Sequence, residues 1–167
     1  MRLQAASRIT DYEMFLWSAQ EFEQADLVLP DGATIHYVRV SDPSGPGPEG
    51  AVFEHVETAE PSATPTAFYR SVLAWNGAGW DLRLKDGTVY VFGDSAPLQA
   101  IRDRYGNTIT IARLVGGIGP VARVTSPHGR WFVFTYDWPH ISQIKDNIGR
   151  TWRYTYDSQS RLWLSYV

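Results

Sequence analysis

Two aspartates, Asp137 and Asp157, each follow a tyrosine directly and stand 20 residues apart. Paired carboxylates across a cleft can serve as the acid and the base of a hydrolase, so this pair is a candidate for catalysis. The alternative is that each carboxylate ends a strand and accepts backbone N–H bonds in the turn that follows. Recurrence at one register favours the turn, because catalytic residues have no reason to follow a repeat. We therefore predict no catalytic residue.

Metal and cofactor chemistry has little support in the sequence. The four histidines, at positions 36, 55, 128 and 140, show no metal-ligand spacing, and the chain has no cysteine. The segment GIGPVA at 117–122 matches a variant of the dinucleotide-binding loop, but a strand-like run follows Pro120 where such a loop needs a helix. We expect no metal and no cofactor.

The composition indicates an ordered β protein. The 167 residues include seven Trp, nine Tyr and seven Phe, and aromatic residues favour strands. A net charge of −3 with 15 scattered basic residues argues against a nucleic-acid partner. No stretch approaches the roughly 18 apolar residues of a membrane span. The N-terminal sequence also lacks the apolar core of a signal peptide.

The first half of the chain divides into two regions. Residues 1–25 fit either a helix capped by Thr10 or an extended aromatic segment, and we favour the extended segment. Residues 26–85 form a β region before the repeats, with Pro- and Gly-rich loops at 41–50 and 58–67. Hairpin turns are predicted at Asp31-Gly32, Asn76-Gly77 and Asp86-Gly87.

A unit of about twenty residues repeats through 86–167. GRWFVFTYD at 129–137 and GRTWRYTYD at 149–157 begin and end alike, and large side chains follow each strand-opening glycine with a period of two. A second, shorter strand follows in each unit, which makes each unit a hairpin too small to bury its own face. We predict an all-β fold, an antiparallel sheet of consecutive β-hairpins. Its aromatic stripe comprises Tyr90, Phe92, Phe132, Phe134, Trp152 and Tyr154.

Over residues 26–167 the chain resembles the Rhs (YD-repeat) family. The residues that carry the resemblance are Gly129, Arg130, Tyr136, Asp137, Gly149, Arg150, Tyr156, Asp157, Arg161 and Leu162. The resemblance implies a hollow, open β shell that holds a toxin domain, as in contact-dependent competition effectors and insecticidal toxin complexes; teneurin ectodomains have related shells. It implies a bacterial protein, secreted or at the cell surface as part of a larger polypeptide.

Two turns depart from the family pattern. Ser160 stands where the family has glycine, so we expect a turn of different type there. The turn at 138–141 is expected to be one residue shorter. We also expect Arg130 and Arg150 to pair across neighbouring hairpins with an aspartate or a carbonyl group.

These observations predict a non-catalytic structural segment of an Rhs-type shell. Its expected partner is the rest of a longer Rhs polypeptide or a toxin domain. The alternative is a carbohydrate- or cell-surface-binding module in which the aromatic stripe stacks on glycans. We expect both edges of the sheet to end abruptly and the isolated chain to self-associate through them.

Overall fold

The computed structural model describes residues 12–42, 47–56, 66–94 and 97–166, and in these residues every regular element is a β-strand. The all-β prediction is confirmed. Parts of the two Pro- and Gly-rich loops lie outside the described residues, as does Thr10. The strands are β1 (Phe15–Trp17), β2 (Gln24–Val28), β3 (Thr34–Arg39), β4 (Val52–His55), β5 (Val72–Trp75), β6 (Gly79–Arg83), β7 (Val89–Gly93), β8 (Leu98–Arg102), β9 (Thr108–Val115), β10 (Ile118–Thr125), β11 (Trp131–Asp137), β12 (His140–Asp146), β13 (Thr151–Tyr156) and β14 (Leu162–Tyr166).

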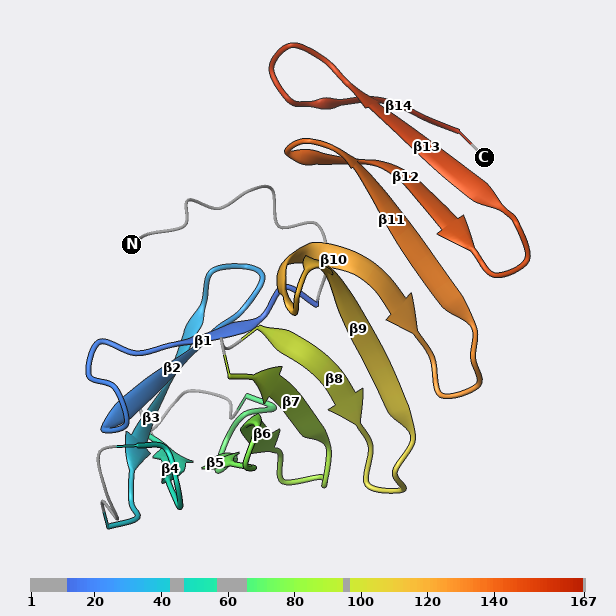
Figure 1. Cartoon of the computed structure of the whole chain (residues 1–167). Coiled ribbons are helices and arrows are strands. Elements are labelled where there is room, and N and C mark those ends of the chain that lie inside the picture. Colours follow the sequence, from blue (N-terminus) through green and yellow to red (C-terminus); the bar gives the residue numbers. More distant parts are fainter. Residues whose placement is uncertain (1–11, 43–46, 57–65, 95–96, 167) are drawn as a thin grey trace.

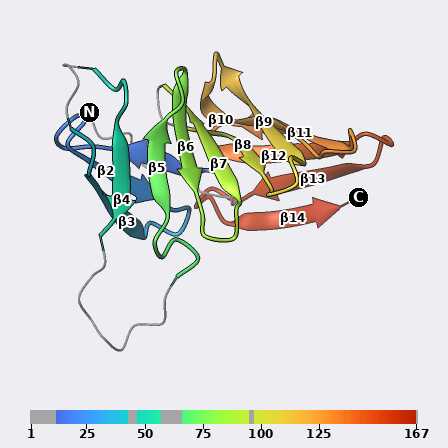
Figure 2. The ribbon, with the colours of Figure 1, turned by 90° about the horizontal axis from the view of Figure 1, so that it is seen from below.

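The 14 strands form one antiparallel sheet in chain order, each paired with its neighbours in sequence. The sheet is strongly curved. Strands β1–β8 curl back on themselves, and β9–β14 continue from them as an arm (Figures 1 and 2). Most connections between neighbouring strands are short, so the order follows largely from the hairpin turns in the sequence; the connections from β3 to β4 and from β4 to β5 are longer and contain the Pro- and Gly-rich loops.

The curl brings β1 back to the connection between β7 and β8. Phe15 forms an isolated antiparallel bridge with Pro97, and the Leu98 N–H donates a 3.1 Å hydrogen bond to the Met14 carbonyl. The edge of β1 is therefore paired at this point, and our expectation that both edges end abruptly is wrong for β1. The extended alternative for residues 1–25 is confirmed where the chain is described, since β1 and β2 occupy this segment.

The hydrophobic core lies on the inner face of the curl. Directly paired residues share a face, and the row Phe53, Leu73 and Leu82 crosses β4, β5 and β6 with side chains no more than 1% exposed. Other buried members of the cluster include Leu27, Tyr37, Phe92, Leu98, Ile111 and Val121. Burial of this face by the curl explains why short hairpins can be stable here.

All three predicted hairpin turns are present. Gly32, Gly77 and Gly87 have φ of 91°, 96° and 89°, a region that side chains other than hydrogen disfavour. They connect β2 to β3, β5 to β6 and β6 to β7.

Candidate functional site

Six connections share one five-residue turn. In each turn, the backbone N–H of the first residue donates to the carbonyl of the fifth residue, and the backbone N–H of the fourth residue donates to the carbonyl of the first residue. The fourth residue always has positive φ. Glycine occupies this place in five turns, and Ser160, with φ 62°, occupies it in the sixth. Our expectation of a different turn type at Ser160 is wrong, because its turn makes the same two hydrogen bonds. The turns span 29–33, 84–88, 103–107, 126–130, 146–150 and 157–161.

In three of these turns, 103–107, 146–150 and 157–161, the first residue is an aspartate that binds its own turn; Asp103 accepts the N–H groups of Tyr105 and Asn107. One carboxylate oxygen of Asp157 accepts the N–H groups of Gln159 and Arg161, and the other accepts Nε of Arg161 at 2.7 Å. Asp146 binds Arg150 in the same way, with Nε at 2.6 Å. Arg150 thus pairs with an aspartate of its own turn, because the fifth residue of the turn faces the first. Our expectation that Arg150 pairs across neighbouring hairpins is wrong. In the turn 126–130 the first residue is Ser126, and its hydroxyl accepts the backbone N–H of Arg130, the fifth residue.

These hydrogen bonds favour the charged carboxylates. Backbone and side-chain hydrogen bonds from Arg161 hold the pKa of Asp157 below its ordinary value. Burial raises the pKa of Asp146, but hydrogen bonds from Arg150 and Ile148 outweigh burial, and the net pKa is again lowered. Both groups are therefore acceptors fixed in turns rather than carboxylates adapted to release and take up protons near neutral pH.

Asp137 occupies a different connection. It pairs directly with His140, so only two residues, Trp138 and Pro139, separate them, and their peptide bond is cis. The prediction of a turn one residue shorter is confirmed. Asp137 is exposed, and in the described part of the chain it makes none of the turn hydrogen bonds of Asp157.

Each repeat hairpin carries a one-residue bulge at the same place in its second strand. The register skips Gln99, Ala122, Ser142 and Trp163 in β8, β10, β12 and β14, respectively. A bulge moves apolar residues three apart onto one face. Leu98 and Ile101 therefore both face Phe92 and Tyr90 across the ladder. We did not predict these bulges, although the spacing in LQAI, VARV and ISQI carries the signal.

In β8, β10 and β12 the carbonyl group just before the bulge accepts a hydrogen bond from the next hairpin. The Tyr136 hydroxyl donates to the Val121 carbonyl at 2.8 Å, and the Tyr156 hydroxyl donates to the Ile141 carbonyl at 3.0 Å. In both cases the acceptor lies 15 residues before the donor. The tyrosine of each Tyr-Asp pair therefore joins its hairpin to the preceding one, a role not evident from the sequence.

Arg113 takes the place of the tyrosine in β9. Its Nε and one terminal nitrogen donate to the Leu98 carbonyl, again 15 residues earlier, at 3.2 and 3.0 Å. The guanidinium also donates to the carbonyls of Gly119 at 2.8 Å and Tyr12 at 2.9 Å. Arg113 thus fastens the N-terminal segment to the start of the arm. We missed this residue because nothing in a single arginine indicates four backbone contacts.

The structure divides the predicted aromatic stripe into two parts. Phe92 is 1% exposed and belongs to the core, and Tyr90 packs against the core. Along the arm, Phe134 and Trp152 both pair with Ile144, so Phe132, Phe134, Trp152 and Tyr154 share one face, and Phe134, like Tyr90, packs against the core. Phe132 is 44% exposed, and its ring centroid lies 6.0 Å from that of Trp152.

The histidines lie apart from one another. His36 pairs with Asp26 at 2.6 Å, and His140 stacks on Tyr156 with centroids 4.4 Å apart. Within the ranges that the structure covers, no group of three His, Cys, Asp or Glu side chains could hold a metal ion. Nor does that part of the chain contain a helix with the length and apolar character needed to cross a bilayer. Comparison of the sequence with models of known protein families and with curated proteins found no match.

Proposed function

We propose that this chain is a non-catalytic structural segment of an Rhs-type (YD-repeat) β shell that encloses or presents a toxin or another partner domain. The observation that carries the proposal is the repeated hydrogen bond from a Tyr-Asp tyrosine to the carbonyl 15 residues earlier. A contact that recurs in two successive hairpins and each time reaches the preceding hairpin is suited to building a continuous wall.

A structural role also agrees with how the repeat residues are used. Asp146 and Asp157 each spend their carboxylate on backbone and arginine groups of their own turn. The tyrosine hydroxyls bind backbone carbonyls. Side chains that form hydrogen bonds within the sheet support the wall, and any chemistry of a larger assembly would lie in its other parts.

The arm offers a surface for an enclosed partner. Phe132 is exposed, Phe134, Trp152 and Tyr154 are half-buried, and all four share one face. Rings that are incompletely covered by their own sheet can pack against apolar groups of a second domain.

The proposal is tested on the polypeptide that the host cell makes. We would immunoprecipitate that polypeptide with an antibody raised against these 167 residues, measure its mass, and image it by negative-stain electron microscopy. A longer chain that forms hollow particles and shields a domain from protease would support the proposal. A native product of only this length, without an associated polypeptide, would contradict it.

Glycan binding is a second candidate, favoured by the exposed ring of Phe132 beside the half-buried ring of Trp152. Aromatic faces of this kind stack on sugar rings. The measurement is a glycan array with the unaltered protein, with Trp152→Ala, and with Trp138→Ala, whose ring is exposed on a turn. Binding that Trp152→Ala abolishes and Trp138→Ala retains would support this function, and an array without any bound glycan would exclude it for the glycans tested.

A further inference from the structure

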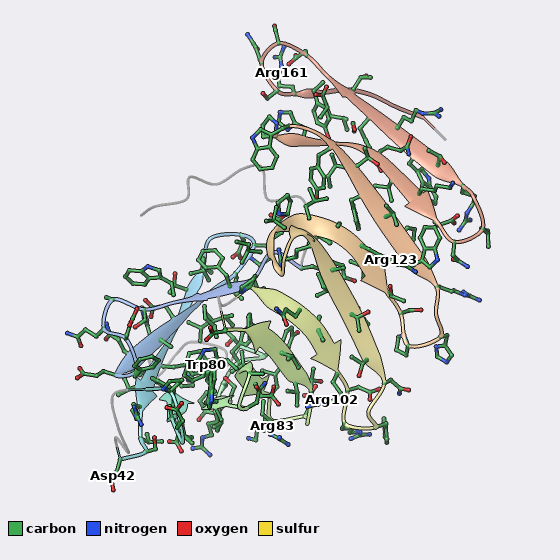
Figure 3. The ribbon with its side chains drawn as sticks, viewed as in Figure 1. Asp42, Trp80, Arg83, Arg102, Arg123 and Arg161 are labelled. Atoms are coloured by element: carbon green, nitrogen blue, oxygen red, sulfur yellow. The ribbon has the colours of Figure 1, made fainter. Side chains whose placement is uncertain are left out.

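A cavity of about 340 Å³ opens at one end of the curl formed by β1–β8. It lies where the β1–β2, β3–β4 and β7–β8 connections meet the adjoining ends of β5 and β6, and the side chain of Trp80, labelled in Figure 3, contributes to its lining. Buried apolar residues such as Phe53 and Leu73 form its floor. Small-molecule sites commonly have volumes from about 300 Å³ upward, an apolar lining and a few polar groups.

The ring of Trp80 stands nearly at right angles to two other aromatic rings of the lining. The rings of Trp75 and Trp80 meet at 71° with centroids 5.1 Å apart. The rings of Phe53 and Trp80 meet at 73° with centroids 5.6 Å apart. Perpendicular rings form a corner that can surround a compact group, whereas a sugar ring is bound best by one flat platform.

Phe22, which also lines the cavity, has a strained backbone. Its φ is 63°, which is unusual for a residue with a bulky side chain. Two side chains hold this conformation through hydrogen bonds to the backbone. Arg39 donates to the Phe22 carbonyl at 3.1 Å, and the Ser18 hydroxyl donates to the Gln24 carbonyl at 2.7 Å. The turn between β1 and β2 is thereby fixed with Phe22 at the cavity.

The charged residues of the lining are both acidic. Glu21 and Asp94 contribute to the lining, and none of the described lining residues is basic. Arg39 stands outside the lining, and its guanidinium donates to the carbonyls of Phe22, Ser41 and Asp42. Aromatic faces and carboxylates both attract positive charge, so the two features select the same kind of ligand.

We propose that this cavity binds a compact organic cation of the trimethylammonium class. The methyl groups would lie in the corner of Trp75 and Trp80, and Glu21 and Asp94 would supply the compensating charge. The ligand could be a free cation or the head group of a lipid, since both present the same trimethylammonium group. The proposal does not depend on the role of the repeats in a shell.

The test uses the full chain labelled with ¹⁵N and follows the tryptophan indole N–H signals by NMR during titration with choline. The neutral isostere 3,3-dimethylbutan-1-ol is the control for shape without charge. We expect choline to shift the Trp75 and Trp80 signals and to bind roughly tenfold more tightly than the isostere. Glycerophosphocholine, titrated in parallel, distinguishes the sources: tighter binding than choline indicates a lipid head group, and weaker binding indicates a free cation.

Two variants assign the site. Trp75→Ala removes a ring that lies outside the hydrophobic core cluster, and we expect choline to bind about tenfold more weakly. Glu21→Gln removes one exposed charge and should weaken binding roughly two- to threefold even if Trp75→Ala perturbs folding. The matched controls are Trp138→Ala and Glu54→Gln, both outside the cavity. Equal binding of choline and its isostere, no shift of the indole signals, or equal losses in the controls would overturn the proposal.

Discussion

The hydroxyl group of Tyr136 donates a 2.8 Å hydrogen bond to the backbone carbonyl of Val121, which precedes a bulge in the preceding hairpin. Burial raises the pKa of Tyr136 to about 12, so the hydroxyl remains a donor over the whole physiological range. The same relationship joins Tyr156 to Ile141.

Replacing Tyr136 by phenylalanine removes the hydroxyl group, so the Val121 carbonyl loses the hydrogen bond that it accepts from Tyr136. We expect Tyr136→Phe to lower the free energy of unfolding by about 1 to 2 kcal/mol, measured by urea denaturation. Tyr154→Phe is the control, because no hydrogen bond of the Tyr154 hydroxyl is found in the described residues, and its effect should stay within about 0.5 kcal/mol. Equal effects of the two variants would contradict the role assigned to Tyr136.

Replacing Arg113 by methionine removes four hydrogen bonds to three carbonyl groups. We expect a loss of about 3 kcal/mol in unfolding free energy, and faster amide hydrogen exchange in β1, because Tyr12 loses its contact with the arm. Arg83→Met removes an exposed guanidinium and serves as the control. Unchanged exchange in β1 would show that Arg113 does not fasten the N-terminal segment.

Acidification should destabilise the repeat turns. The pKa values of Asp103, Asp146 and Asp157 are lowered in the folded chain, so these carboxylates stabilise it above their ordinary pKa near 4. As the pH falls below about 4 the unfolded chain binds more protons than the folded chain, and stability declines. Asp157→Asn should flatten this decline in urea midpoints measured from pH 2 to 7. The same decline in Asp157→Asn and in the unaltered protein would refute the assignment.

Exchanging serine and glycine between two turns measures the cost of the left-handed backbone conformation at the fourth residue of the turn. Ser160→Gly should stabilise the chain by about 1 kcal/mol, because Ser160 holds φ 62° at a cost that glycine does not have. Gly149→Ser should destabilise by a similar amount, since a Cβ at Gly149 would meet no atom within 4 Å and only backbone strain is added. Thermal unfolding measures both. Shifts of the same sign would contradict this explanation.

The isolated chain should self-associate through β14. In the described residues β14 pairs with β13 alone, at the edge seen in Figure 2, whereas β1 is bridged to Pro97. An unpaired strand edge exposes N–H and carbonyl groups that can pair with another chain. Sedimentation velocity over a range of concentrations should show a growing fraction of dimer or larger species. A compact monomer at all concentrations would contradict this prediction.

Local turn chemistry explains why much of the fold was predictable. Glycines at 32, 77 and 87 fix hairpins through their backbone freedom, and the period of two after Gly129 and Gly149 fixes which side chains share a face. The curl was not predictable, because the meeting of Phe15 with Pro97 joins segments 82 residues apart in sequence and depends on the accumulated curvature of the strands between them.

The cavity and the anchoring by Arg113 escaped sequence analysis for the same reason. Phe22 and Asp94 lie in separate connections and Trp75 is the last residue of β5, so the three become neighbours only when the sheet curls. Tyr136 and Tyr156 were recognised as repeat residues, but their acceptors are main-chain oxygens, which carry no signature in the letters of a sequence.

The backward direction of the tyrosine contacts gives the sheet a polarity of assembly. The Tyr156 hydroxyl needs the bulge beside Ile141 in β12 for its acceptor, so each hairpin completes its hydrogen bonds against the hairpin that precedes it in the chain. During synthesis each acceptor carbonyl is made before the tyrosine that binds it. Removing a whole repeat would keep the 15-residue spacing between donors and acceptors, whereas removing a single residue between a donor and its acceptor would change that spacing.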